Sequence, residues 1–154
     1  MDFFKSTGSL FPAYDARRPI RILLVEDNPA DVRLTRELFD RGFAPSVIEV
    51  AEDGECALAY LQHQPPYSGV ATPDLILLDL NLPRLSGREL LAEIKRDPAL
   101  AAIPVMVLSS SGAAADILAA YELRAISYIM KPADRGQVRA ALGSIDPFWL
   151  NPPA

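Results

Sequence analysis

The sequence predicts an α/β fold in which a doubly wound, five-stranded parallel sheet is covered by five helices. Short apolar runs alternate with amphipathic segments along the chain, and the connections between them are short. Parallel neighbouring strands need crossover connections, and the amphipathic segments supply them. At 154 residues the chain has the length of one domain with a proper core, and we expect no second domain.

The composition excludes several classes of protein. A net charge of −5 and an isoelectric point near 4.8 argue against a nucleic-acid or membrane-surface binder, which would carry a basic patch. No apolar run is long enough for a membrane span, and the N-terminus lacks the features of a signal peptide. The single cysteine, Cys56, allows no intramolecular disulfide. We therefore expect a cytoplasmic protein.

The first predicted strand follows an N-terminal extension. Residues 1–19 mix aromatic residues with Gly, Ser and Pro and show no period, so they predict either a loose extension or an arm that packs on the domain or a partner. Ile20–Val25 is apolar and ends in Glu26 and Asp27. A helix should then begin at Asn28-Pro29, a good cap and first position, and close at Gly42.

The next elements lead to the centre of the sheet. Ser46–Val50 predicts a short strand, and Asp53-Gly54 opens a helix that carries apolar residues as far as Leu61. Gln64–Thr72, with its Pro and Gly residues, predicts a loop. The four apolar residues Leu75–Leu78 then predict a strand buried on both faces, as in the middle of a parallel sheet.

The second half of the chain repeats this alternation. Ser86 should cap a helix that ends at Asp97-Pro98, and Ile103–Leu108 should form the fourth strand. Ala113–Leu123 predicts a helix, Ile126–Met130 the fifth strand, and Ala133–Ile145 the last helix.

Asp79, at the end of the central strand, is the first candidate site residue. An unpaired buried carboxylate costs much free energy, and ligands in open α/β sheets bind outside the carboxyl ends of the strands. The alternative is a helix N-cap. Pro83 and Ser86-Gly87 place the next helix start several residues later, which favours a site.

Other reactive side chains also follow strands. In a parallel sheet these strand ends share one edge, so Glu26, Asp27, Asp79, Ser109 and Lys131 should converge there. Three carboxylates in one pocket repel one another, and a hard divalent cation such as Mg²⁺ relieves that repulsion. Lysine and serine can bind phosphate oxygens, and aspartate is a known nucleophile for phosphoryl groups. The set is equipped for phosphoryl transfer to an aspartate.

These residues lie in motifs that resemble the receiver domain of two-component response regulators. The motifs are Leu24-Val25-Glu26-Asp27-Asn28, Leu77-Leu78-Asp79-Leu80-Asn81-Leu82-Pro83, Val105–Ser109 and Lys131-Pro132. The resemblance covers residues 20–146 and leaves residues 147–154 as a C-terminal tail. It implies a flavodoxin-like fold with strand order 2-1-3-4-5.

The resemblance also implies a role for each site residue. Asp79 would accept a phosphoryl group from a histidine kinase, and Lys131 would contact that group. Ser109 matches the switch hydroxyl and Tyr128 the switch aromatic residue. The Mg²⁺ ligands would be Glu26, Asp27, Asp79 and the main-chain carbonyl of Asn81. The chain would then be a phosphoacceptor with at most self-catalysed phosphotransfer and dephosphorylation, and not an enzyme.

Three segments, Val25–Phe39, Asp74–Pro98 and Ile145-Asp146-Pro147-Phe148-Trp149-Leu150, also resemble the single-domain regulators paired with phytochrome kinases, which commonly dimerise. This resemblance implies a phytochrome histidine kinase as partner and a homodimer through the last helix and Phe148-Trp149-Leu150. The alternative is that Trp149 folds back on the helix face formed by Val138, Leu142 and Ile145.

Arg124 departs from the family, because most receivers carry Gly at this position, which suits a left-handed helix cap.

Two other functions compete with the phosphoacceptor. An enzyme of the haloacid-dehalogenase type needs a second acid two residues after its nucleophile, and Asn81 cannot exchange protons there. A receiver-like interaction module that is never phosphorylated would be expected to lose an acid or the lysine, and none is lost. His63 lies in a Gln- and Pro-containing turn, which argues against a phosphohistidine.

Overall fold

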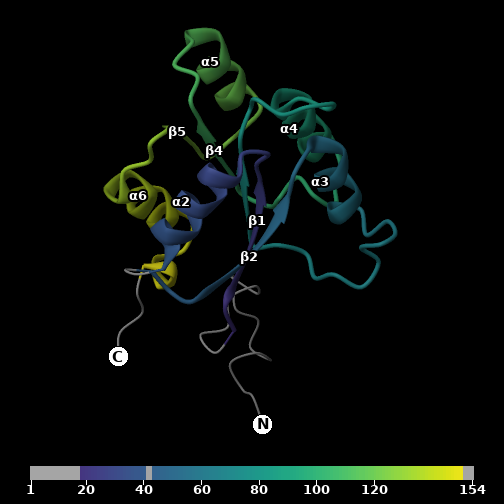
Figure 1. Cartoon of the computed structure of the whole chain (residues 1–154), viewed down its shortest axis with the longest axis horizontal. Helices are drawn as coiled ribbons and strands as arrows, with labels where there is room; N and C mark the ends of the chain where they lie inside the picture. Colours follow the sequence, from purple (N-terminus) through teal and green to yellow (C-terminus); the bar gives the residue numbers. More distant parts are fainter. Residues whose placement is uncertain (1–17, 41–42, 151–154) are drawn as a thin grey trace.

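The computed structural model describes residues 18–40 and 43–150 and contains a five-stranded, fully parallel sheet between two layers of helices (Figure 1). The strand order is β2-β1-β3-β4-β5, which confirms the predicted fold class and order. The strands are β1 Ile20–Val25, β2 Ser46–Ala51, β3 Leu75–Leu78, β4 Val105–Ser109 and β5 Ser127–Met130. The helices are α2 Pro29–Phe39, α3 Gly54–Leu61, α4 Gly87–Arg96, α5 Ala114–Glu122, α6 Arg135–Ile145 and the short 3-10 helix η1 Pro147–Trp149.

Each face of the sheet carries its own hydrophobic core. One core joins the sheet to α3, α4 and α5, and the other joins it to α2, α6 and η1. Figure 1 shows α2 and α6 together on one side and α3 and α4 on the other. Strand β3 supplies both cores, because Ile76 and Leu78 belong to the first and Leu75 and Leu77 to the second. All four are fully buried, as predicted for the central strand.

The predicted starts of α2, α3 and α4 are confirmed by their caps. The side chain of Asn28 accepts hydrogen bonds from the first turn of α2, Asp53 accepts one from Cys56, and Ser86 accepts one from Glu89. Helix α6 begins two residues later than predicted because Asp134 is its cap. These caps fix where the loops at the carboxyl edge of the sheet end.

Other predicted boundaries also differ from the structure by one or more residues. Strand β4 begins at Val105 rather than Ile103 and includes Ser109, which pairs with Met130. Pro104, just before it, has no N–H to donate, although its carbonyl accepts from Ile76. Helix α2 ends at Phe39 with Asp40 as its cap. The predicted closing residue, Gly42, lies outside the described residues.

Arg124 adopts the left-handed conformation suggested by its position, with φ of 63°. Its N–H donates to the carbonyl of Tyr121, and the N–H of Ala125 donates to the carbonyl of Ala120, which together form a Schellman motif after α5. A non-glycine residue in this conformation costs roughly 1–2 kcal/mol. Arg124 therefore adopts the turn conformation that glycine favours, at a cost in conformational free energy.

The C-terminal segment folds back on its own domain. Trp149 is only 5% exposed and lies in the same core as Val138 and Leu142, while the N–H of Ala44 donates to its carbonyl over 2.9 Å. This confirms the folded-back arrangement of Trp149. Phe148, by contrast, is 55% exposed.

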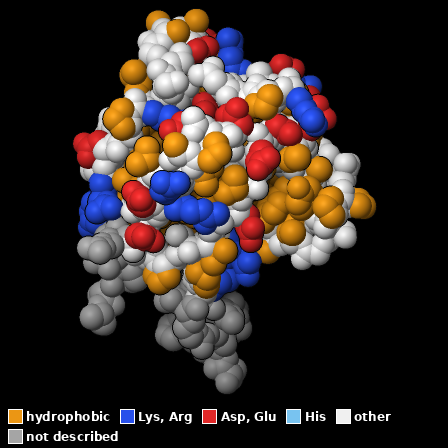
Figure 2. All heavy atoms as spheres, in the orientation of Figure 1, with side chains coloured by type: hydrophobic (Ala, Val, Ile, Leu, Met, Phe, Trp, Pro, Cys, Tyr) orange, Lys and Arg blue, Asp and Glu red, His pale blue; other side chains and the backbone are white. Residues whose placement is uncertain are grey.

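The described surface carries charges of both signs. Figure 2 shows acidic and basic side chains interspersed over the visible face, with apolar side chains between them. Among the described residues, no helix has the length and apolarity needed to cross a bilayer.

Candidate functional site

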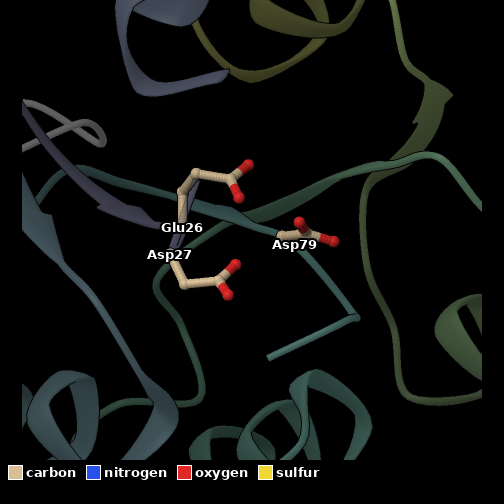
Figure 3. A group of neighbouring side chains, drawn as sticks. All are labelled: Glu26, Asp27 and Asp79. Carbon is tan, nitrogen blue, oxygen red and sulfur yellow. The ribbon is translucent and has the colours of Figure 1, made fainter. Parts of the chain in front are cut away.

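Three carboxylates meet beyond the ends of two neighbouring strands. Glu26 and Asp27 follow β1, and Asp79 follows β3, which pairs directly with β1. Each offers one oxygen, and these oxygens lie within 4.8 Å of one another (Figure 3). Glu26 and Asp79 are buried and Asp27 is exposed, so the cluster opens to solvent on one side.

Lys131, which follows β5, places its ammonium group against this cluster. Its Nζ donates to Asp79 Oδ2 over 3.0 Å and to Asp31 Oδ2 over 2.9 Å, and it also hydrogen-bonds Glu26 Oε1. Convergence on one edge was predicted from the strand ends for Glu26, Asp27, Asp79, Ser109 and Lys131. The hydrogen bond of the Ser109 hydroxyl is made with Ser111 and not with this cluster. Asp31, in the first turn of α2, was missed.

Main-chain amides orient the two buried carboxylates. The N–H of Asn81 donates to Asp79 Oδ1 over 3.0 Å, and the N–H of Asn28 donates to Glu26 Oε2 over 3.3 Å. Asp79 therefore has one oxygen held by its own loop and the other by Lys131. Asn81 thus lies beside the cluster, and its carbonyl as a metal ligand stays a prediction.

Burial and neighbouring charges shift two pKa values in the cluster. Burial raises the pKa of Glu26 to about 7; the hydrogen bond from Lys131 opposes this shift, and the charge of Asp79 adds to it. For Lys131, burial would lower the pKa, but hydrogen bonds to Glu26, Asp31 and Asp79 outweigh burial and raise it. The lysine is therefore a permanent cation, whereas burial and crowding work against the charge on Glu26.

The donor set fits a hard divalent cation. Glu26, Asp27 and Asp79 offer carboxylate oxygens, which Mg²⁺ and Mn²⁺ prefer, and the described residues place no sulfur or imidazole ligand in the cluster. Asp27, exposed and outside the hydrogen bonds of Lys131, adds negative charge that one ammonium does not neutralise.

The loop after Asp79 is held between the starts of two helices. A Cβ on Gly87 would lie 2.4 Å from Leu80 Cα and 2.5 Å from the carbonyl oxygen of Asp79. A Cβ on Gly54 would lie 2.3 Å from the carbonyl oxygen of Leu85. Only glycine allows such close backbone contacts, so this loop packs directly on α3 and α4.

The predicted switch residues, Ser109 and Tyr128, both form hydrogen bonds with the main chain of Ser111. Ser109 is fully buried, and its Oγ accepts a hydrogen bond from the N–H of Ser111 over 3.2 Å. The hydroxyl of Tyr128 donates to the carbonyl of Ser111 over 2.7 Å. Ser111 in turn donates its own hydroxyl to Asp116 over 2.6 Å. Sequence reasoning missed this role of Ser111, which depends on main-chain atoms.

A groove of about 520 Å³ runs from Lys131 along α2. Its walls are mostly apolar, and Leu34, 57% exposed, is one of the residues that line it. The other lining residues are Asp31, Thr35, Glu37, Leu38, Leu108, Ser110, Lys131, Pro132, Ala133 and Arg135.

The fold and the acidic cluster define a class of signalling domain, and comparison with known proteins identifies it. The family model for the response regulator receiver domain matches residues 22–143, so the chain belongs to this family. Receiver domains bind a divalent metal, in agreement with the donor set described above.

Within this family, the chain is similar over most of its length to individual response regulators. Response regulator Rcp1 from Synechocystis sp. is 42% identical over 136 residues, which are 88% of this chain and 92% of that protein. Its Mn²⁺-bound crystal structure gives a TM-score of 0.73 over 88% of this chain and all of that one. The phosphorylated cyanobacterial phytochrome response regulator RcpA is 46% identical, with a TM-score of 0.74 over 87% of this chain and 96% of that chain.

A relative with a different description is nearly as similar. The probable methanogenesis regulatory protein FilR2 from Methanothrix harundinacea is 38% identical over 151 residues, which are 97% of this chain and 94% of that protein. The chain is thus a response regulator of the receiver family, homologous to phytochrome response regulators.

Proposed function

We propose that this chain is a phosphoacceptor of a two-component system, in which Asp79 receives a phosphoryl group from a histidine kinase. The observation that carries the proposal is the buried Asp79 carboxylate, which lies beside two acids and 3.0 Å from the ammonium of Lys131. Such a carboxylate is placed for a reaction with a highly charged group. The chain would act as an acceptor and not as an enzyme.

The residues of the cluster have distinct tasks in this transfer. An oxygen of Asp79 attacks the phosphorus of the phosphohistidine, the new P–O bond forms as the P–N bond breaks, and the imidazole leaves with the bonding electron pair. Lys131 supplies a fixed positive charge to the oxygens of the transferred group. Mg²⁺ held by Glu26, Asp27, Asp79 and the carbonyl of Asn81 would neutralise the charge of that group.

Incubation with acetyl phosphate and Mg²⁺ tests the proposal. Intact-mass spectrometry should show addition of one phosphoryl group, and omission of Mg²⁺ should prevent it. A folded protein that takes up no phosphoryl group would instead support the alternative, a receiver-like interaction module that is not phosphorylated.

Metal binding should depend on Asp27. Replacement of Asp27 by Ala removes a charged, solvent-facing ligand and should weaken Mg²⁺ binding at least tenfold, or about 1.4 kcal/mol. Isothermal titration calorimetry measures this change. The matched control is Glu122→Ala, which removes an exposed acid at the end of α5 and should leave the affinity unchanged. Equal affinities of Asp27→Ala and wild type would exclude Asp27 as a ligand.

The response to phosphorylation should depend on Ser109. Phosphorylation of Asp79 should draw the Ser109 hydroxyl toward the phosphoryl group and away from Ser111, so that the loop held by Tyr128 rearranges. Ser109→Ala should still accept the phosphoryl group within about threefold of the wild-type rate. Hydrogen exchange in residues 110–113 should no longer change on phosphorylation. Ser110→Ala, at an exposed neighbour, is the control and should respond as wild type.

We propose a phytochrome-type histidine kinase as the partner. The support is similarity to RcpA, described as a phytochrome response regulator, and to Rcp1. The groove beside Lys131, with exposed Leu34 in its wall, offers a partner an apolar contact next to Asp79. Phosphotransfer profiling against the histidine kinases of the source organism tests this pairing. Because FilR2 is described as a methanogenesis regulatory protein, preferred phosphotransfer from a kinase of another type is the competing outcome.

We also propose a homodimer that uses the C-terminal helix and the segment Phe148-Trp149-Leu150. Because Trp149 is buried in its own domain, the contact would rely on the exposed ring of Phe148. Sedimentation velocity of the full chain at micromolar concentration, with and without a phosphoryl mimic, tests the dimer. A monomer under both conditions would exclude it.

A further inference from the structure

Lys131 is shared by three carboxylates, and only two of them belong to the cluster of Glu26, Asp27 and Asp79. Glu26 and Asp79 offer the cluster oxygens that a cation would use, whereas Asp31 lies outside the cluster on the first turn of α2. The Nζ–Oδ2 distance to Asp31, 2.9 Å, is as short as the 3.0 Å to Asp79. An ammonium has three N–H donors, so these contacts use all of them.

The two contacts of Lys131 inside the cluster would weaken when a cation binds. Lys131 and the metal compete for the carboxylates of Glu26 and Asp79, because both cations need the same anionic groups at close range. The ammonium group would then need another acceptor, since Lys131 is only 16% exposed and water reaches it poorly. Asp31 is that acceptor, and its side chain, 31% exposed, lies nearer the mouth of the site.

We propose that Asp31 is a positioning residue for Lys131. It keeps the ammonium group at the mouth of the site while a divalent cation takes Glu26 and Asp79, and it holds that group where a phosphoryl oxygen on Asp79 would arrive. Its place is fixed locally, because Asn28 caps α2 and Pro29 occupies the first helical position. The metal half of the inference stands alone, and the phosphoryl half rests on the proposed function of Asp79.

A simpler account of Asp31 makes a different prediction. An acid in the first turn of a helix is stabilised by the helix dipole, whatever lies opposite it. The negative charge of Asp31 would also attract a bound cation directly. Neither effect depends on Lys131, so the two accounts predict different effects of Asp31→Asn on Mg²⁺ affinity once the lysine is replaced.

A double-mutant cycle on Mg²⁺ affinity separates them. Calorimetric titration with Mg²⁺ alone should give about fivefold weaker binding for Asp31→Asn than for wild type, and Asp31→Glu should restore most of the affinity. In the Lys131→Met background, Asp31→Asn should change the affinity less than about twofold. Glu37→Gln, on the same helix and in the wall of the same groove, controls for charge and should also have less than about a twofold effect.

Each outcome decides the question. An equal loss of affinity with and without Lys131, or no loss in the single variant, would overturn the proposal; thermal unfolding verifies that each variant is folded. At saturating Mg²⁺, Asp31→Asn should also slow phosphorylation by acetyl phosphate about threefold, which a purely structural role would not do. If wild type takes up no phosphoryl group, the proposed function fails, but the Mg²⁺ cycle still decides the role of Asp31.

Discussion

Replacement of Asp79 by Asn should abolish phosphoryl incorporation, with a rate at least about a thousandfold below wild type, or about 4 kcal/mol in the barrier. The amide has nearly the shape of the carboxylate, and its oxygen can still accept from Lys131 or from the N–H of Asn81. The variant should therefore fold normally while it lacks a nucleophilic oxygen anion. Intact-mass time courses with acetyl phosphate and Mg²⁺ measure the loss.

The control for this experiment is another aspartate replaced in the same way. Asp40→Asn, at the exposed end of α2 and outside the carboxylate cluster, should be phosphorylated at the wild-type rate. If Asp79→Asn still takes up one phosphoryl group at that rate, Asp79 is not the acceptor. Peptide mapping would then identify the residue that is.

Replacement of Trp149 by Ala should destabilise the domain by about 3–5 kcal/mol, the usual cost for a large buried aromatic side chain. Trp149 is 5% exposed and belongs to the core that joins the sheet to α2 and α6. Since a domain is stable by only about 5–15 kcal/mol, the urea midpoint should fall steeply. Phe148→Ala is the matched control, and because its ring is 55% exposed it should cost less than about 1 kcal/mol.

This difference decides how the dimer can be examined. Truncation after Ile145 removes Trp149 and the hydrogen bond between its carbonyl and Ala44, so it would test stability rather than association. A substitution at Phe148 alone leaves the core intact. Equal destabilisation by Trp149→Ala and Phe148→Ala would contradict the packing described for Trp149.

Much of the fold follows from local sequence signals. The run Leu75–Leu78, bounded by Pro73 and Pro83, predicted a strand buried on both faces, and the side chains of Asn28, Asp53 and Ser86 mark helix starts by their own hydrogen bonds. The start of β4 was predicted two residues early, because apolar Ile103 extends the hydrophobic pattern past a proline that cannot donate to the sheet.

The site residues that could be predicted are those whose positions follow from the order of the strands in the sheet. Glu26, Asp79 and Lys131 converge because the carboxyl ends of parallel strands share an edge. Asp31 was missed because an acid in the first turn of a helix has a sufficient local explanation, and its contact with Lys131 depends on the orientation of α2. Ser111 joins Ser109 and Tyr128 through main-chain atoms, which every residue type provides, so its identity carried no signal.

The close backbone contacts of Gly54 and Gly87 restrict the segment that follows Asp79. With backbone pressed against Gly54 and Gly87, the segment between Asp79 and α4 has no free space on the side of α3 and α4. The loop after β4, which follows the strand next to β3, is held instead by hydrogen bonds that Ser111 and Tyr128 donate. Under the proposed function, we therefore expect phosphorylation of Asp79 to rearrange the hydrogen-bonded loop after β4 rather than the segment that packs on Gly54 and Gly87. Steric constraint, and not the phosphoryl group itself, would select which surface of the domain carries the signal.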